Sequence, residues 1–137
     1  MNGPNLMKVF IVEDSKIVIE RLFRLCSEYP DIEVVGTASG GRKALRAIAD
    51  CRPDVVILDL RLQGGTGWEL LRTLKASPTP PVVIMLTNFP SVFHKVKASQ
   101  TGADHFLDKA EEFEKLGPIL ESIAQSEKTV FKSPERT

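Results

Sequence analysis

At residues 55–59 the chain reads Val55-Val56-Ile57-Leu58-Asp59, an apolar run that ends on a carboxylate. Four consecutive β-branched or aliphatic residues predict a short strand buried on both faces, as strands of parallel sheets are. Three further runs have the same character and lead to polar residues: Lys8–Val12 before Glu13 and Asp14, Val82–Leu86 before Thr87, and His105–Leu107 before Lys109. Parallel strands joined by helices share one carboxyl edge, where open α/β sheets bind ligands. The sequence therefore predicts that these polar residues meet at one site.

Helical patterns alternate with the strand signals, which include a shorter one at Glu33–Val35. The apolar stripes of the predicted helices are Val18, Leu22, Leu25, Cys26 and Tyr29; Ala44, Leu45 and Ile48; Leu70, Leu71 and Leu74; Val92, Phe93 and Val96; and Ile119, Leu120, Ile123 and Ala124. Ser15 is the predicted N-cap of the first helix and Gly102 the predicted C-cap of the fourth. Since proline is tolerated at a first helical position, the last helix is predicted to start at Pro118, after a separate turn at Glu111–Leu116.

The bulk composition indicates a single cytoplasmic domain. The 137 residues suit one core, and 18 basic residues balance 18 acidic ones, so no nucleic-acid or membrane surface is expected. No apolar run is long enough to span a bilayer, and the N-terminus lacks a secretory signal. Cys26 and Cys51 lie in helical stripes, so we expect two reduced thiols, and neither His94 nor His105 has zinc-ligand spacing with them.

The two ends of the chain have a different composition from the rest. Residues 1–6 and 126–137 are polar or contain proline, and we expect them to be flexible, which leaves a domain at residues 7–125. The tail from Lys128 to Thr137 does not resemble the beginning of another domain, which favours a switch that acts without an effector domain of its own.

Each acidic residue has an ordinary explanation when it is taken alone. Asp14 could cap the first helix, and Asp59 could be a loop carboxylate. Together with Glu13, however, they would gather three carboxylates on adjacent strands, and their repulsion must be relieved by protons or a cation. A hard divalent ion with oxygen ligands meets this need, so Mg²⁺ (or Mn²⁺) is the expected cofactor.

Lys109 and Thr87 complete the set of groups at this edge. Alone, Lys109 could be an exposed lysine and Thr87 an ordinary strand residue. Beside three carboxylates, the ammonium becomes a fixed counter-charge, and both side chains can donate to phosphoryl oxygens. A carboxylate nucleophile, a metal ion, an ammonium and a hydroxyl are the parts needed to transfer a phosphoryl group to an aspartate.

Five separated motifs resemble the receiver domain of two-component response regulators, here a single-domain, chemotaxis-type receiver, in order and at family spacing. They are Phe10-Ile11-Val12-Glu13-Asp14-Ser15, Val56-Ile57-Leu58-Asp59-Leu60, Gly67-Trp68-Glu69-Leu70-Leu71, Met85-Leu86-Thr87-Asn88 and Gly102-Ala103-Asp104-His105-Phe106-Leu107-Asp108-Lys109. The resemblance covers about residues 7–125. It implies a flavodoxin-like, doubly wound α/β fold with a five-stranded parallel sheet in the order 2-1-3-4-5 and five flanking helices.

The resemblance also implies roles for the acidic residues. Asp59 matches the phosphoacceptor, and Asp14 matches the direct metal ligand. Glu13 matches the acid that acts mainly through metal-bound water, and Arg61 supplies a backbone carbonyl to the metal.

The remaining implied roles concern binding and reading the phosphoryl group. Thr87 and Lys109 match the phosphoryl-binding pair, and Phe106 occupies the aromatic switch position. Arg61 and Phe89, each two residues after a site residue, lie where the family tunes hydrolysis. Because both are bulky, we expect slow autodephosphorylation.

Three positions depart from the family pattern. Ala110 follows Lys109 where many receivers have proline, so the peptide there is expected to be trans. Gln63 stands at a loop position where proline is common. Gly117-Pro118 is expected to shorten the last helix and to make the output face beside it atypical. None of these changes an acidic ligand.

The expected partners are a histidine kinase or phosphotransfer protein and a downstream protein that the sequence does not identify, with the chain itself a monomer or weak dimer. We expect its catalysis to be limited to self-phosphorylation and slow autodephosphorylation, so that it is not an enzyme in the usual sense.

Two alternative functions are open to the sequence. A phosphatase of the haloacid-dehalogenase type is the first, but Arg61 stands where that mechanism needs an acid. A degenerate receiver used only for binding is the second, and the complete acidic set argues against it.

Overall fold

The computed structural model describes residues 5–62, 65–88 and 90–131. Its centre is one parallel sheet of five strands: β1 (Met7–Val12), β2 (Ile32–Ala38), β3 (Val55–Leu58), β6 (Val82–Thr87) and β7 (His105–Asp108). Their order across the sheet is β2-β1-β3-β6-β7, which in chain order is 2-1-3-4-5. The predicted flavodoxin-like, doubly wound α/β fold is therefore confirmed.

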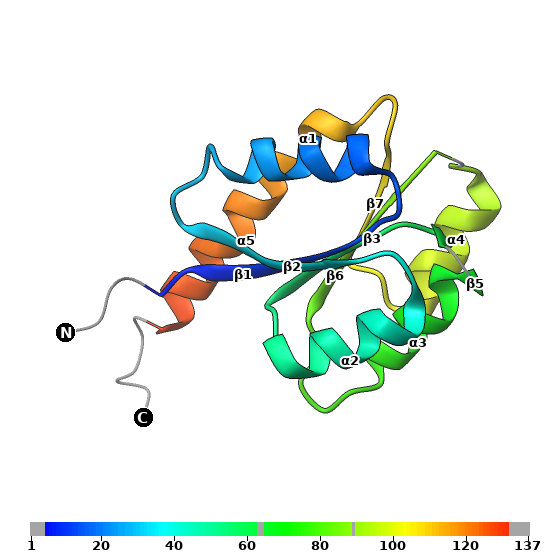
Figure 1. The fold of residues 1–137 in the computed structure, drawn as a ribbon, viewed down its shortest axis with the longest axis horizontal. Helices are drawn as coiled ribbons and strands as arrows, with labels where there is room; N and C mark the ends of the chain where they lie inside the picture. Colours follow the sequence, from blue (N-terminus) through cyan, green and yellow to red (C-terminus); the bar gives the residue numbers. More distant parts are fainter. Residues whose placement is uncertain (1–4, 63–64, 89, 132–137) are drawn as a thin grey trace.

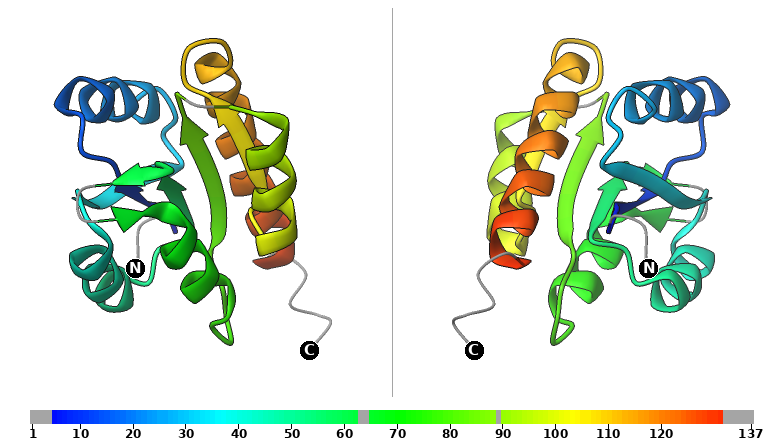
Figure 2. Two further views of the ribbon diagram at one scale, coloured as in Figure 1. Left: turned by 90° about the vertical axis from the view of Figure 1, so that its right-hand side faces the viewer. Right: turned by 90° about the vertical axis from the view of Figure 1, so that its left-hand side faces the viewer.

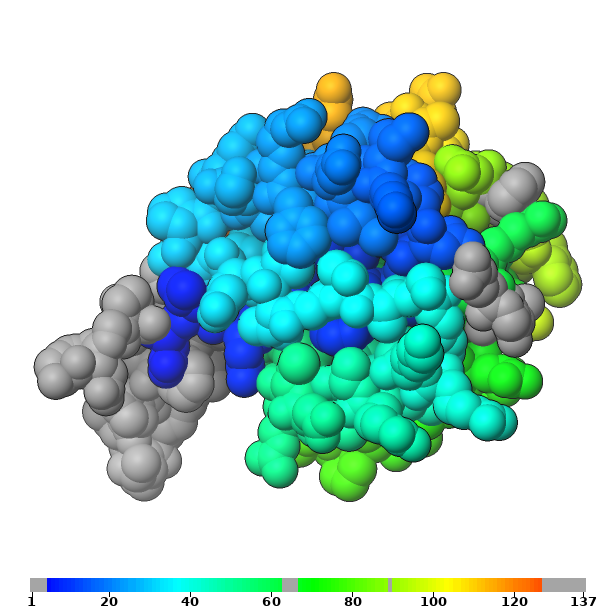
Figure 3. Space-filling model, viewed as in Figure 1, coloured from blue at the N-terminus to red at the C-terminus, as the bar shows by residue number. Residues whose placement is uncertain are grey.

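Five helices cover the two faces of this sheet (Figure 1). Helices α1 (Lys16–Cys26) and α5 (Leu116–Phe131) lie on one face. Helices α2 (Gly41–Cys51), α3 (Gly67–Lys75) and α4 (Val92–Thr101) lie on the other. Figure 2 shows the edge strand β7 flanked by α4 and α5. At the opposite edge, β2 runs between α1 and α2 on the face seen in Figure 3.

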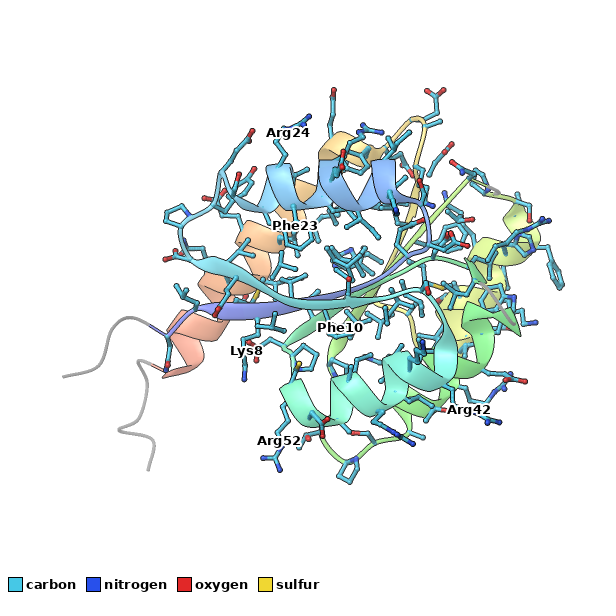
Figure 4. All side chains as sticks on the ribbon, in the orientation of Figure 1. Lys8, Phe10, Phe23, Arg24, Arg42 and Arg52 are labelled. Atoms are coloured by element: carbon cyan, nitrogen blue, oxygen red, sulfur yellow. The ribbon has the colours of Figure 1, made fainter. Side chains whose placement is uncertain are left out.

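Alternate residues of each strand point to two separate cores, because successive side chains leave opposite faces of a sheet. In β1, Val9 and Ile11 pack with α1 and α5, whereas Phe10 and Val12 pack with α2, α3 and α4. Phe10 is 1% exposed and lies on the α2 side of the sheet (Figure 4). Both faces of the central strands are buried, which explains why their sequences are apolar throughout rather than alternating.

The two helix caps that the sequence predicted, Ser15 and Gly102, are present, and Ser91 forms a further cap that it did not predict. The Ser15 hydroxyl accepts a hydrogen bond from the backbone N–H of Val18 at 3.3 Å, which caps α1. The Ser91 hydroxyl does the same for His94 at the start of α4, at 3.0 Å. Gly102 ends α4 with φ of 108°, a backbone conformation that glycine adopts without strain.

Several boundaries differ from the prediction. Strand β2 extends through Gly36 to Ala38, well past the predicted Glu33–Val35. The turn before the last helix is a 3₁₀ helix, η1, at Phe113–Lys115, and α5 follows it directly from Leu116. Pro118 is thus the third residue of α5, where its missing N–H has no partner within the helix in any case.

Two expectations about the end of the domain are corrected by α5. The helix has 16 residues and ends at Phe131, so Gly117-Pro118 does not shorten it. It also extends past residue 125, where the sequence placed the domain boundary. Nothing between Pro118 and Phe131 breaks a helix, since the next proline or glycine in the chain is Pro134.

Three smaller expectations can be compared with the structure. The peptide bonds of the described residues include no cis bond, so Lys109 and Ala110 are joined in trans as predicted. Cys26 is buried, Cys51 is half-buried, and both are free thiols. Among the described helices, none combines the length and apolar character that crossing a membrane requires. Gln63 lies outside the described residues.

Candidate functional site

The predicted site residues meet at the carboxyl ends of four adjacent elements of the sheet. Backbone hydrogen bonds continue the strand pairing by one residue: Glu13 N–H donates to Ala38 O at 2.9 Å, Asp59 N–H to Val12 O at 3.0 Å, and Lys109 N–H to Thr87 O at 2.8 Å. The strand order then brings Glu13, Asp59, Thr87 and Lys109 to the carboxyl edge of the sheet, and the strands end at the right of Figure 1.

Lys109 lies at the centre of this group. Its Nζ is 2.8 Å from Oε1 of Glu13 and donates a hydrogen bond to Oδ2 of Asp59 at 3.1 Å. The exposed fractions are 7% for Lys109, 3% for Glu13 and 7% for Asp59, so water screens these charges little. With Thr87, they make up the buried polar or charged residues of the described chain. One ammonium therefore links two buried carboxylates.

The second oxygen of each carboxylate is held by the backbone. Ser15 N–H donates to Oε2 of Glu13 at 3.0 Å, and Arg61 N–H donates to Oδ1 of Asp59 at 3.3 Å. Both carboxylates are thus fixed in orientation from two sides, which prepares them for a ligand before it arrives. The sequence prediction gave Ser15 only as a helix cap, and it did not identify the N–H of Arg61 as a donor.

The charges shift the ionisation of two side chains. Burial raises the pKa of Glu13 above its usual value; the hydrogen bond from Lys109 opposes this shift, and the charge of Asp59 adds to it. Burial alone would lower the pKa of Lys109, but its bonds and attraction to Glu13 and Asp59 outweigh burial and raise it. Lys109 therefore remains a cation at neutral pH, while the carboxylates repel one another.

Asp14 adds a third carboxylate to this pair. One oxygen from each of Glu13, Asp14 and Asp59 lies within 4.8 Å of the others, and Asp14 is exposed to solvent. Oxygen ligands of this kind, open to water on one side, suit Mg²⁺, which keeps several of its waters when it binds protein carboxylates. The donor set therefore fits the cofactor that the sequence predicted. Arg61 is the first residue of β4, two residues after Asp59.

The loop after Asp59 folds back against it. Strands β4 (Arg61–Leu62) and β5 (Gly65–Thr66) pair as a small antiparallel hairpin, which the sequence did not predict. Gly67 N–H then donates to Leu60 O at 2.7 Å, and a Cβ on Gly67 would come within 2.5 Å of the carbonyl oxygen of Asp59. Only glycine fits this approach, so the Gly-rich loop has a positional role beside the site.

Of the two predicted aromatic site residues, Phe106 and Phe89, the structure describes only Phe106. Phe106 is half-buried and packs against the core shared by α2, α3 and α4. It lies in β7, where it pairs with Met85 of β6, two residues before Thr87. Phe89 lies outside the described residues.

Comparison with known proteins gives the family. The sequence profile of the response regulator receiver domain matches residues 9–121. A protein-glutamate methylesterase/protein-glutamine glutaminase of Geobacillus kaustophilus is 38% identical over 104 residues, which are 75% of this chain and 30% of that protein. The DNA-binding transcriptional activator DevR/DosR of Mycobacterium tuberculosis is 34% identical over 76% of this chain and 48% of its own length. The chain spans about a third of the length of the methylesterases that it matches.

Solved structures agree with the sequence comparison. The signal receiver domain of the response regulator NarL of Mycobacterium tuberculosis superposes with a TM-score of 0.81 at 26% identity, over 89% of this chain and 98% of that one. The response regulator domain of Thermotoga maritima CheB gives 0.75 at 25% identity, over 88% and 95%. These matches favour a receiver domain over the phosphatase of the haloacid-dehalogenase type that the sequence left as an alternative. With five predicted motifs, the strand order and the profile in agreement, the chain belongs to the response regulator receiver domain family.

Proposed function

We propose that this chain is a phosphoaccepting switch of a two-component system, as its membership of the receiver domain family supports. We propose that Asp59 is its phosphoacceptor, that Asp14, Glu13 and the Arg61 carbonyl hold Mg²⁺ or Mn²⁺ with it, and that Thr87 and Lys109 bind the phosphoryl group. The observation that supports this assignment is the pair of contacts from Lys109 to Glu13 and Asp59 at 2.8 and 3.1 Å, with Asp14 close to both carboxylates.

The proposed chemistry follows from these positions. A carboxylate oxygen of Asp59 forms a bond to phosphorus as the bond between phosphorus and a histidine nitrogen of the donor breaks, and the histidine leaves with a proton. When bound, the metal ion offsets the negative charge that gathers at the acidic residues. Lys109 and Thr87 stabilise the phosphoryl oxygens through an ammonium and a hydroxyl donor. Nothing else in this set activates water, so we infer phosphoacceptor chemistry with slow hydrolysis and no further enzymatic activity.

Phosphorylation by a small donor tests the acceptor. Incubation with acetyl phosphate and Mg²⁺ should add one phosphoryl group to Asp59, detected by intact-protein mass spectrometry and then by peptide mapping. Asp59→Asn should abolish the modification. Asp54→Asn is the matched control, because Asp54 lies at the other end of β3, where its Oδ2 accepts a hydrogen bond from Lys8 N–H. The assignment would be excluded if Asp59→Asn were still modified in full and peptide mapping showed that the phosphoryl group had not moved to another carboxylate.

The proposed switch couples Thr87 to Phe106. A phosphoryl group on Asp59 would draw the Thr87 hydroxyl towards it and open space beside β7, into which the Phe106 ring would rotate further. Phe106 has no hydroxyl to hold it at the surface, and its half-buried position is consistent with a small free-energy gap between states, on the order of 1–2 kcal/mol. Chemical-shift comparison of free and beryllofluoride-bound protein tests this, with beryllofluoride in place of the phosphoryl group. Identical Phe106 and Thr87 signals in both would exclude the switch.

The proposed output surface includes α4. Val92, Phe93 and Val96 of this helix are 79%, 69% and 49% exposed, and they lie within one turn of each other. Exposed apolar side chains that cluster in this way are typical of protein-binding surfaces. We infer that a downstream protein binds the face formed by α4, β7 and α5, and that a histidine kinase or phosphotransfer protein approaches the carboxylate edge.

Hydrolysis of the phosphorylated state is proposed to be slow because Arg61 and Phe89 are both large. In-line attack by water must pass the side chains at these positions. The double variant Arg61→Asn, Phe89→Glu should shorten the lifetime of phosphorylated protein, measured by loss of the modification after removal of acetyl phosphate. An unchanged lifetime would remove the steric argument.

A further inference from the structure

The connection from β7 to α5 contains a carboxylate, Glu112, with two different contacts. Its Oε1 accepts a hydrogen bond from the backbone N–H of Asp108 at 3.0 Å. Its Oε2 forms an ion pair with Nζ of Lys115 at 3.0 Å. The backbone N–H of Glu112 also donates to Asp108 O at 2.8 Å, so Asp108 and Glu112 hold each other from both ends of a five-residue turn.

Lys109 lies inside this turn, and the backbone around it is fixed at three consecutive residues. The N–H of Asp108 donates to Glu112, the N–H of Lys109 donates to Thr87 O at 2.8 Å, and the N–H of Ala110 donates to Oδ1 of Asp108 at 2.9 Å. The side chain of Lys109 leaves this backbone towards Glu13 and Asp59. A shift of the turn would therefore move the ammonium relative to both carboxylates.

The residue after Lys109 explains why the turn needs these bonds. Ala110 keeps an N–H and a free φ, whereas proline would have fixed φ and removed the donor. Since no ring restricts this backbone, its conformation depends on hydrogen bonds from neighbouring side chains. Glu112 and Asp108 supply them, and Glu112 acts at the residue directly before Lys109.

We propose that Glu112 is a positioning residue for phosphoryl transfer, holding the Lys109 ammonium at the acidic site through its hydrogen bond to the Asp108 N–H. This proposal rests on the phosphoryl-binding role proposed above for Lys109. It concerns a group that contacts neither the phosphoryl group nor the metal.

The ionisation of Glu112 agrees with these contacts. The hydrogen bond from the Asp108 backbone lowers the pKa of Glu112, the hydrogen bond from Lys115 adds to the shift, and the charge of Lys95 on α4 contributes as well. The carboxylate is therefore the form present at neutral pH, and it accepts both bonds. Lys115 is 64% exposed, so its ion pair is screened by water and is expected to contribute little.

Four variants separate the hydrogen bond from the ion pair. Glu112→Ala removes both contacts, Glu112→Gln keeps an oxygen that can accept from Asp108 N–H, and Lys115→Met removes only the ion pair. Lys109→Ala shows whether the rate of phosphorylation depends on the Lys109 ammonium. For each we would measure the rate of phosphorylation by acetyl phosphate at saturating Mg²⁺, the Mg²⁺ dissociation constant, and stability towards urea.

We expect Glu112→Ala to slow phosphorylation about 5-fold, as the loss of one hydrogen bond of typical net strength would. Glu112→Gln and Lys115→Met should stay within about 2-fold of the parent protein, because the bond to Asp108 remains. Mg²⁺ affinity should not fall in any of the three, since the acidic ligands are intact. Rescue by glutamine is the result that a general loss of stability would not produce.

Two results would overturn the positioning role. One is a normal rate in Glu112→Ala. The other is a Glu112→Gln variant as slow as Glu112→Ala, which would assign the effect to charge. If Lys109→Ala is slow while Glu112→Ala is normal, only the positioning role fails. If Lys109→Ala itself keeps the parental rate, the phosphoryl-binding role of Lys109 fails, and the positioning role with it.

Discussion

The two edges of the sheet use the same residue types in opposite ways. At the amino edge, Oδ2 of Asp104 accepts hydrogen bonds from Val83 N–H and from Nζ of Lys75, both at 2.8 Å. Lys75 also donates to Pro81 O at 2.9 Å. At the carboxyl edge, the carboxylates of Glu13, Asp14 and Asp59 lie close together, and Lys109 forms ion pairs with two of them, Glu13 and Asp59.

The difference lies in charge balance and exposure. The side chain of Asp104 is 39% exposed and has its own lysine and a backbone donor, so it joins β6 to β7 without repulsion. Glu13 and Asp59 are buried, and the charge of Asp59 contributes to raising the pKa of Glu13. The amino edge is thus arranged for stability. The carboxyl edge retains excess negative charge, which a metal ion or a protonated partner can offset.

Metal binding should show the largest effect of this contrast. Asp14→Ala removes the exposed carboxylate that we propose as a direct ligand, so Mg²⁺ affinity should fall about 10- to 100-fold. Glu13→Ala should lower Mg²⁺ affinity less, because the two oxygens of Glu13 are already in contact with Lys109 and with the Ser15 N–H. Titration of Trp68 fluorescence measures both, since Trp68 directly follows Gly67 beside Asp59. Equal, negligible losses would mean that the ion binds elsewhere.

Stability should respond most at the amino edge. Asp104→Ala leaves Val83 N–H and Lys75 without their acceptor, so the free energy of unfolding should fall by about 1–3 kcal/mol. Phosphorylation by acetyl phosphate should be unchanged. Urea unfolding and the phosphorylation rate, measured on the same preparation, test the separation of the two edges. A phosphorylation defect at full stability would contradict it.

At the carboxyl edge, removing a charge should raise the free energy of unfolding rather than lower it. Asp59→Asn relieves repulsion with Glu13 and Asp14 while Lys109 keeps its contact with Glu13. Without Mg²⁺, we expect the free energy of unfolding to rise by about 0.5–1 kcal/mol. Addition of Mg²⁺ should reverse the order, because it stabilises the parent protein by mass action. Destabilisation of Asp59→Asn in metal-free urea unfolding would show that its bond to Lys109 outweighs the repulsion.

The smallest effect is expected at Glu112, in the turn that follows β7. Its pKa is lowered in the folded state, so its contribution to stability is present above the unfolded value of 4.5 and is lost as pH falls through the folded value. The stability difference between the parent protein and Glu112→Gln should therefore shrink as pH falls below about 4.5. Urea unfolding of both proteins between neutral and acidic pH measures it. A difference that grows on acidification would contradict the direction of the shift.

The sequence predicted the parts of the molecule that depend on long apolar patterns. The strand Val55–Leu58, the Ser15 cap of α1 and the Gly102 cap of α4 agree with the structure, because burial and capping leave local signals. The hairpin of β4 and β5 was missed, since strands of two residues carry no periodicity. The extension of β2 was missed because Gly36 has low strand propensity.

The site could be predicted only as a set of side chains. The sequence predicted that Asp59 and Lys109 lie close together, because both follow parallel strands and the carboxyl ends of parallel strands share one edge of the sheet. The donors that orient the carboxylates, the N–H groups of Ser15 and Arg61, could not be predicted. Every residue except proline carries such a group, so its direction depends on the folded backbone alone.

Helix α4 is attached to the sheet more weakly than its neighbours. Its buried residue is Ala98, a small side chain, whereas α3 buries Gly67, Leu70, Leu71 and Leu74. Little apolar area must be exposed to tilt or unfold α4, so its free energy of local opening should be low. Its backbone amides should then exchange with deuterated water sooner than those of α3. The movement proposed for Thr87, which precedes α4 in the chain, would then change how often this helix opens.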